Sequence, residues 1–101
     1  MKQVTVQRTR FVVRGLVQGV NFRASVVQEA STGELTGRVW NRDDGAVELM
    51  VEGDETALAD LAGWLRQGPR LAEVLSLERS DVAGARRYRD FAISYGPASE
   101  K

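Results

Sequence analysis

Cysteine and histidine are both absent from this sequence of 101 residues. Without cysteine the chain has no disulfide, no thiolate nucleophile and no cysteine-based metal site. Without histidine it has no imidazole for proton transfer or for metal ligation. These absences exclude thiolate and imidazole chemistry, and we expect an activity that uses neither a metal ion nor a cofactor.

Long apolar runs and net charge are also missing. No stretch approaches the length that crosses a membrane, and the N-terminus has no signal-peptide core. The 14 basic and 14 acidic residues balance, which argues against a nucleic-acid or membrane partner held by net charge. We expect a cytoplasmic monomer with a single domain over residues 1–101, whose core spans about residues 7–95.

Alternating and helical patterns of apolar residues predict five strands and two helices. The predicted strands cover residues 8–14, 35–40, 46–52, 73–82 and 91–95, and the predicted helices cover 22–31 and 55–67. This order is βαββαβ with a short fifth strand. It is typical of a ferredoxin-like α/β sandwich in the α+β class, with two helices on one face of an antiparallel sheet.

Three residues are predicted to mark helix ends. Asn21 and Asp54 should cap the two helices, because their side-chain oxygens can accept from free N–H groups of the first turn. Gly33 should end the first helix in a left-handed conformation.

The sheet face turned away from the helices is predicted to be largely solvated, with charge pairs between strands. It would carry Arg10, Arg14, Arg38, Trp40, Glu48 and Glu52. An RNA-binding sheet of this fold needs stacking aromatics on its central strands and a basic surface. The strand at 46–52 has no aromatic residue and an acidic open face, so the pattern argues against an RNA partner.

The stretch from Gly15 to Arg23, GLVQGVNFR, joins the first predicted strand to the first predicted helix. Its glycines let the backbone adopt positive φ and approach a ligand closely. The N–H groups that open a helix lack intrahelical partners, and the helix dipole favours an anion there. Arg23 would add a fork that can grip two phosphate oxygens. A tight turn followed by a surface arginine is the alternative interpretation.

This stretch and the later Thr36–Asn41, TGRVWN, together resemble the acylphosphatase family. That family has Gly-x-Val-Gln-Gly-Val-x-Phe-Arg followed, at a compatible spacing, by Gly-x-Val-x-Asn. The Asp-Gly turn and the Trp-Leu-Arg-x-Gly-Pro stretch are similar to the family as well, so the resemblance covers nearly the whole chain.

The resemblance implies a hydrolase that splits a small-molecule acyl phosphate into a carboxylate and inorganic phosphate. It implies that Arg23 binds the phosphate and that Asn41 positions the attacking water. The implied phosphate cradle comprises Val17, Gln18, Gly19, Val20, Asn21, Phe22 and Arg23, and product phosphate or sulfate should bind there too. Asn21 occupies a position that varies in the family.

The composition suits such a reaction. A carboxylate leaving group needs no general acid, and the transition state needs its phosphoryl charge held and a water placed in line. Arginine and oriented amides suffice for that, and an oxygen of the substrate phosphate could take the proton from water.

Three alternatives remain open from the sequence. Asn41 could serve only the geometry of the turn that ends at Gly45. The chain could bind phosphate without catalysis, or it could be the acylphosphatase-like part of a larger hydrogenase-maturation protein. The sequence does not specify the acyl group, because no pocket for it is visible there.

Overall fold

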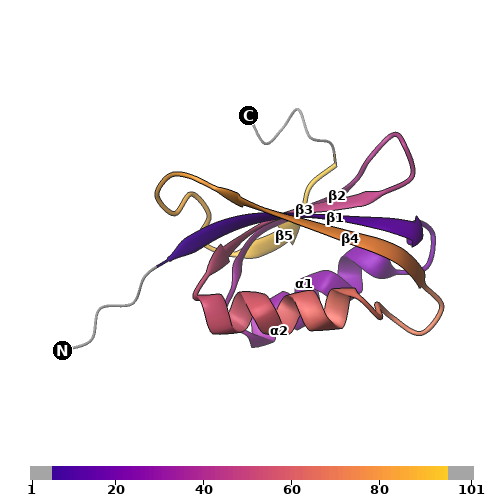
Figure 1. Ribbon diagram of the computed structural model, residues 1–101, viewed down its shortest axis with the longest axis horizontal. Helices are drawn as coiled ribbons and strands as arrows, with labels where there is room; N and C mark the ends of the chain where they lie inside the picture. Colours follow the sequence, from indigo (N-terminus) through magenta and orange to yellow (C-terminus); the bar gives the residue numbers. More distant parts are fainter. Residues whose placement is uncertain (1–5, 96–101) are drawn as a thin grey trace.

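The computed structural model describes residues 6–95, which form a five-stranded sheet with two helices packed on one face (Figure 1). The strands are β1 (Gln7–Leu16), β2 (Thr36–Asn41), β3 (Val47–Gly53), β4 (Glu73–Val82) and β5 (Phe91–Ile93), and the helices are α1 (Phe22–Thr32) and α2 (Glu55–Leu65). The bounds confirm the predicted elements to within two residues. Neither helix is long and apolar enough to cross a membrane, as far as the described residues go.

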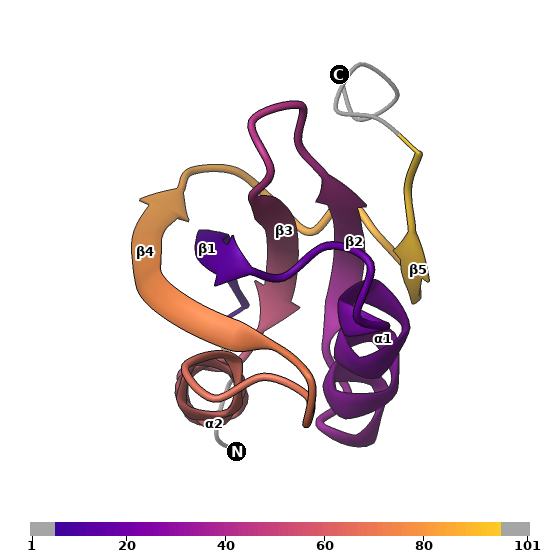
Figure 2. The same ribbon diagram turned by 90° about the vertical axis from the view of Figure 1, so that its right-hand side faces the viewer.

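The sheet is mixed, which corrects the prediction of a wholly antiparallel one. Its strand order is β4-β1-β3-β2-β5, and β5 pairs with β2 in parallel while the other neighbours are antiparallel. The physical reason is that the chain crosses the sheet between β4 and β5, so β5 starts at the same end as β2. The C-terminal ends of β1, β2 and β5 therefore lie together at one end of the sheet, where β4 begins. Figure 2 shows the molecule from this end of the sheet.

The main core lies between the helices and the sheet. The apolar stripes of α1 and α2 are at most 2% exposed at Phe22, Val26, Ala30, Leu58, Leu61 and Leu65. The sheet residues packed against them are fully buried, namely Phe11, Val13, Val39, Val47, Leu49 and Val51. Burying one such side chain stabilises the fold by roughly 1.5–3 kcal/mol, so these stripes fix the helices on the sheet.

The opposite sheet face is more buried than predicted. Trp40 is 3% exposed and Glu52 is fully buried. The β4–β5 connection contributes Tyr88, which packs with Trp40 and Met50. The predicted solvated face is therefore wrong for its centre. The face is buried because the β4–β5 connection covers the apolar residues Trp40 and Met50, and the strand pattern does not reveal this connection.

Glu52 holds that connection in place. Its carboxylate accepts hydrogen bonds from the backbone N–H groups of Arg87 and Tyr88, at 2.8 and 2.9 Å. The guanidinium of Arg8 lies 2.8 Å from the same carboxylate, and a second cross-strand pair joins Arg10 to Glu48 at 2.9 Å. The predicted charge pairs between strands are thus confirmed, although one of them is buried.

The helix ends match the prediction only at α2, where Asp54 accepts from the N–H of Ala57 at 2.8 Å. Asn21 makes no side-chain cap, because its backbone is left-handed, with φ 62° and ψ 27°, rather than extended as a cap requires. Gly33 is not left-handed either, with φ −89°. The N–H of Gly33 donates to the carbonyl of Ala30, which tightens the last turn of α1. The left-handed residue after this helix is Glu34, with φ 59°.

Candidate active site

Residues from four segments meet at the end of the sheet where β1, β2 and β5 end. They come from the β1–α1 loop, the first turn of α1, the end of β2 and the end of β5, which lie at the same end of the molecule (Figure 2). Together they line a cavity of about 200 Å³ whose residues are Val17, Gly19, Asn21, Phe22, Arg23, Ala24, Asn41 and Ile93. The fold thus brings Arg23 and Asn41, which the family resemblance singled out, to one cavity.

Two left-handed residues shape the loop in front of α1. Gly19 has φ 76° and Asn21 has φ 62°. Glycine and asparagine are the residue types that adopt this conformation at the lowest cost. Left-handed residues within a turn let successive backbone N–H groups converge on a concave site that suits an anion.

The N-terminus of α1 is open to a ligand. It has no side-chain cap and no acidic residue in its first turn. The first helical hydrogen bond runs from the N–H of Ser25 to the carbonyl of Asn21, at 3.2 Å. The N–H groups of the residues before Ser25 therefore have no intrahelical acceptor, and the helix dipole favours an anion beside them. The missing Asn21 cap thus leaves these donors without a side-chain acceptor, which is the arrangement that suits an anion.

Arg23 is the second residue of α1 and is half-buried. Within residues 6–95 no carboxylate pairs with its guanidinium, which lies 5.8 Å from the ring centroid of Tyr95. In the same described range, six other arginines form ion pairs, namely Arg8, Arg10, Arg14, Arg38, Arg42 and Arg79. A cation at a helix N-terminus is disfavoured by about 0.3–1 kcal/mol. The placement of Arg23 is therefore favourable when an anion lies beside it.

Asn41 is the last residue of β2, opposite Val47 of β3. Its Oδ1 atom is buried and accepts no hydrogen bond from any residue that the structure describes. An unsatisfied buried acceptor costs about 1–3 kcal/mol, so a donor at this position is strongly favoured. The turn that follows is closed by the N–H of Arg42 bonding the carbonyl of Ala46 at 2.8 Å, without the Asn41 side chain.

Gln18 has a role that its place in the motif did not reveal. Its side-chain Nε2 donates to the carbonyl oxygens of Arg42 and Ala46, at 2.8 and 2.9 Å. Both carbonyls belong to the β2–β3 turn that follows Asn41. The side chain therefore ties the β1–α1 loop to that turn, and Gln18 is not among the residues that line the cavity. Such a long-range contact carries no signal in the sequence.

The cavity differs from the predicted cradle at a few other positions. Val20 faces a neighbouring cavity instead, together with Asn21. Ala24 and Ile93 line the cavity but were not predicted. Ala24 follows from the helical turn, whereas Ile93 is brought in by the pairing of β5 with β2, which sequence spacing alone does not indicate.

Asp44 braces the β2–β3 turn next to Asn41. Its carboxylate accepts from the N–H of Ala46 at 3.1 Å, and the guanidinium groups of Arg14 and Arg42 lie 3.1 and 3.0 Å away. The hydrogen bond from Ala46, together with these two cations, lowers the pKa of Asp44 to about 2. Hydrogen bonding to Asp44 raises the pKa of both arginines.

We expect the Asp44→Asn variant to melt with a weaker pH dependence than the unchanged protein between pH 3.8 and about 2. Folding lowers the pKa of Asp44, so its ionised carboxylate stabilises the fold at higher pH, and this contribution is lost as the pH falls through that window. Melting temperatures measured across the window test this. Asp43→Asn, an exposed change in the same turn, is the control. Equal slopes for the unchanged protein and Asp44→Asn would contradict the assignment.

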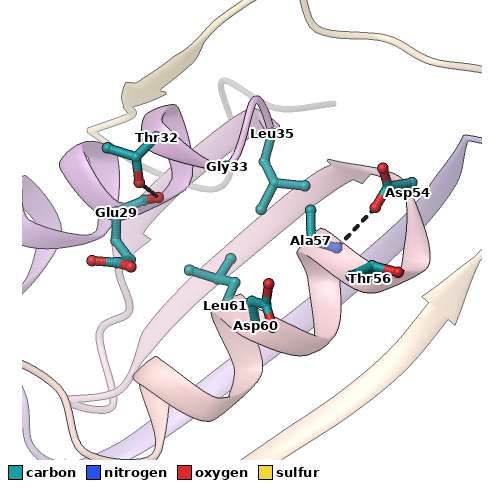
Figure 3. Close-up of a pocket in the computed structure, with 9 residues that line it drawn as sticks. All are labelled: Glu29, Thr32, Gly33, Leu35, Asp54, Thr56, Ala57, Asp60 and Leu61. Atoms are coloured by element: carbon teal, nitrogen blue, oxygen red, sulfur yellow. Dashed lines mark hydrogen bonds between the residues drawn. The ribbon is translucent and has the colours of Figure 1, made fainter.

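A larger cleft of about 370 Å³ lies between the end of α1 and the start of α2 (Figure 3). Its lining includes the carboxylates Glu29, Asp54 and Asp60 and no basic residue. Asp54 is engaged in capping α2. A phosphate would be repelled there, so the smaller cavity with Arg23 is the candidate active site.

The fold is a ferredoxin-like domain, and its candidate site is a cavity beside the uncapped N-terminus of α1, at the end of the sheet where β1, β2 and β5 end. The acylphosphatase family model matches residues 9–93. The acylphosphatase of Pasteurella multocida is 43% identical over 88 residues, which are 87% of this chain and 98% of the relative. That of Methylococcus capsulatus is 42% identical over 88 residues, covering 87% of this chain and 96% of the relative.

Solved structures agree with these sequence matches. An acylphosphatase from Coxiella burnetii superposes with a TM-score of 0.86 at 34% identity, covering 93% of this chain and 100% of that chain. An acylphosphatase from Bacillus subtilis gives 0.85 at 35% identity, covering 90% and 100%. Full-length HypF in a phosphate- and nucleotide-bound form gives 0.84 at 26% identity, but the match covers 92% of this chain and only 12% of HypF.

The chain belongs to the acylphosphatase family. It is an enzyme that hydrolyses acyl phosphates, which argues against the alternative of a non-catalytic binding module.

Proposed function

We propose that the β1–α1 loop and Arg23 bind the phosphoryl group of the acyl phosphate, and that Asn41 positions the attacking water. One observation carries this proposal: the Arg23 guanidinium, without an ion-pair partner in residues 6–95, and Asn41 Oδ1, without a hydrogen bond there, belong to residues that line a single cavity. That cavity lies at an uncapped helix N-terminus. The first of these groups suits an anion, and the second suits a hydrogen-bond donor such as water.

The reaction then needs little beyond placement. The phosphoryl oxygens accept from the loop N–H groups and from Arg23, which together hold the charge that spreads over them in the transition state. The Asn41 amide turns its Oδ1 atom toward the cavity, and a water donates one hydrogen bond to that atom. The lone pair of the water then points at phosphorus in line with the acyl oxygen. The water oxygen bonds to phosphorus as the phosphorus–oxygen bond to the acyl group breaks, and the electron pair leaves with the carboxylate.

A substrate phosphate oxygen receives the proton of the water in this proposal. The residues that line the cavity include no carboxylate and no lysine, so none of them is a general base. The leaving carboxylate is a weak base and needs no proton donor. A monomer with a single domain over residues 1–101, whose core spans about residues 7–95, stays a prediction for the active unit. A cytoplasmic location stays a prediction.

Inorganic phosphate and sulfate are expected to inhibit competitively, because either anion fits the N–H groups and the fork of Arg23. Steady-state rates at several concentrations of substrate and anion measure this, and crystals soaked in sulfate locate the ion. Non-competitive inhibition, or an ion bound only at a surface arginine such as Arg66, would contradict the proposed cradle.

Activity is expected to persist in the presence of a chelator. The charge of the phosphoryl group is met by Arg23 and by backbone N–H groups, which act without a metal ion. The measurement is the rate of phosphate release after dialysis against a chelator, with and without added magnesium. A rate that falls on dialysis and returns with magnesium would overturn this part of the mechanism.

A further inference from the structure

A second cavity, of about 400 Å³, adjoins the candidate active site. It is lined by Val20, Asn21, Pro69, Arg70 and Leu71. Asn21 also lines the cavity of Arg23, so the two cavities meet at this residue. Figure 2 places the α2–β4 connection and the β1–α1 loop at the same end of the molecule. A substrate held by its phosphoryl group could therefore extend across Asn21 into this second cavity, which we call the acyl groove.

Three of the five residues that line the acyl groove are apolar. Leu71 is 70% exposed, and Val20 and Pro69 add further apolar atoms beside it. None of the lining residues is acidic, and Arg70 makes no ion pair with any residue in the described range 6–95. Exposed apolar surface next to a binding site is typical of a ligand contact. An apolar group attached to an anion suits this combination of side chains.

The connection that carries Leu71 is fixed against the start of α1. Gly68 is left-handed, with φ 69°, and its N–H donates to the carbonyl of Trp64 at 2.8 Å. A Cβ at Gly68 would come within 2.8 Å of the Phe22 ring, so the backbone passes directly over the first residue of α1. The rings of Phe22 and Trp64 are also in contact, with centroids 6.0 Å apart. The acyl groove therefore has a fixed position relative to the phosphate cradle.

We propose that the acyl groove binds the acyl group of the substrate, and that Leu71 makes the enzyme prefer apolar acyl groups that extend beyond the carbonyl. This inference rests on the proposed function, because it requires the phosphoryl group to lie in the cradle. A benzoyl group reaches the side chains of the groove, whereas an acetyl group ends close to the phosphate. Leu71 is then a specificity-determining residue for the known reaction.

The test compares kcat/KM for benzoyl phosphate with kcat/KM for acetyl phosphate, and the ratio of the two is the preference. We expect the unchanged protein to prefer benzoyl phosphate. Leu71→Ser should lower the preference roughly three- to tenfold, less than an enclosed pocket loses for one methylene, because the groove is open. Leu75→Ser is the matched control, since Leu75 is 74% exposed and lines a different cavity. It should keep the original preference.

The outcomes of this test distinguish a failure of the acyl groove from a failure of the proposed phosphate cradle. A preference that is the same in Leu71→Ser and in the unchanged protein would overturn the inference and leave the cradle intact. A preference that persists in Leu71→Ser but disappears in Tyr95→Ala would also overturn it, because the acyl group would then lie against Tyr95, which contacts Arg23 and does not line the acyl groove. Failure of the unchanged protein to hydrolyse either substrate would overturn both proposals.

Discussion

Replacing Asn41 by alanine is expected to lower kcat by roughly 10²–10³-fold while the inhibition constant of phosphate changes little. The variant loses the acceptor for the attacking water, and that interaction acts chiefly in the transition state. The phosphate site remains, because Arg23 and the loop N–H groups are untouched. A fall in kcat with retained anion binding marks such an interaction. Steady-state kinetics with benzoyl phosphate and a phosphate inhibition constant measure both quantities.

A melting curve of the same Asn41→Ala variant separates catalysis from turn formation. If Asn41 only shaped the turn, its removal would lower stability and leave kcat nearly intact. Asp43→Ala changes an exposed residue of the same turn and serves as the control for general effects on the hairpin. A folded Asn41→Ala protein with a near-normal kcat would remove Asn41 from the mechanism.

Arg23→Lys is expected to lower kcat/KM by roughly 10–100-fold and to weaken phosphate inhibition in parallel. Lysine keeps the positive charge but loses the planar fork that bonds two phosphate oxygens at once. One charge-assisted hydrogen bond contributes about 1.5–3 kcal/mol, and each 1.4 kcal/mol corresponds to about tenfold. The effect should fall on both binding and turnover, because the fork holds the phosphoryl group before and during the reaction.

Arg66→Lys is the matched control for this substitution. Arg66 is exposed and, in the range 6–95, forms no ion pair. Its replacement should leave both constants unchanged. An Arg23→Lys enzyme with the original kcat/KM would mean that a point charge suffices and that the bidentate grip is not part of the mechanism.

The elements of the fold could be predicted because their signals are local. The bounds of β4 agree at both ends, and the leucines that repeat along α2 form its buried stripe. The parallel β5 and the buried outer face could not be predicted in this way. Both depend on the path of the β4–β5 connection. Glu52 holds this connection through the backbone of Arg87 and Tyr88, which lie 35 and 36 positions further along the sequence. Hydrophobic periodicity is blind to such contacts.

Some residues of the site could be predicted from the sequence, but their contacts with distant parts of the chain could not. Arg23 and Asn41 were named from the family resemblance, and the fold places them at one cavity. The bond from Gln18 to the β2–β3 turn exists only after β1 and β2 are both in the sheet. The Asn21 cap failed because the loop fixes its backbone in a left-handed conformation, which residue type alone does not determine.

The central claim is that a water held by Asn41 attacks the phosphorus of an acyl phosphate bound at Arg23. Hydrolysis of benzoyl phosphate in water enriched in the heavy oxygen isotope tests this directly, with mass spectrometry of both products. The mechanism predicts that the label enters inorganic phosphate and that benzoate stays unlabelled, because the bond that breaks lies between phosphorus and the acyl oxygen. Label in the benzoate would mean attack at the carbonyl carbon, which would contradict the roles of both residues.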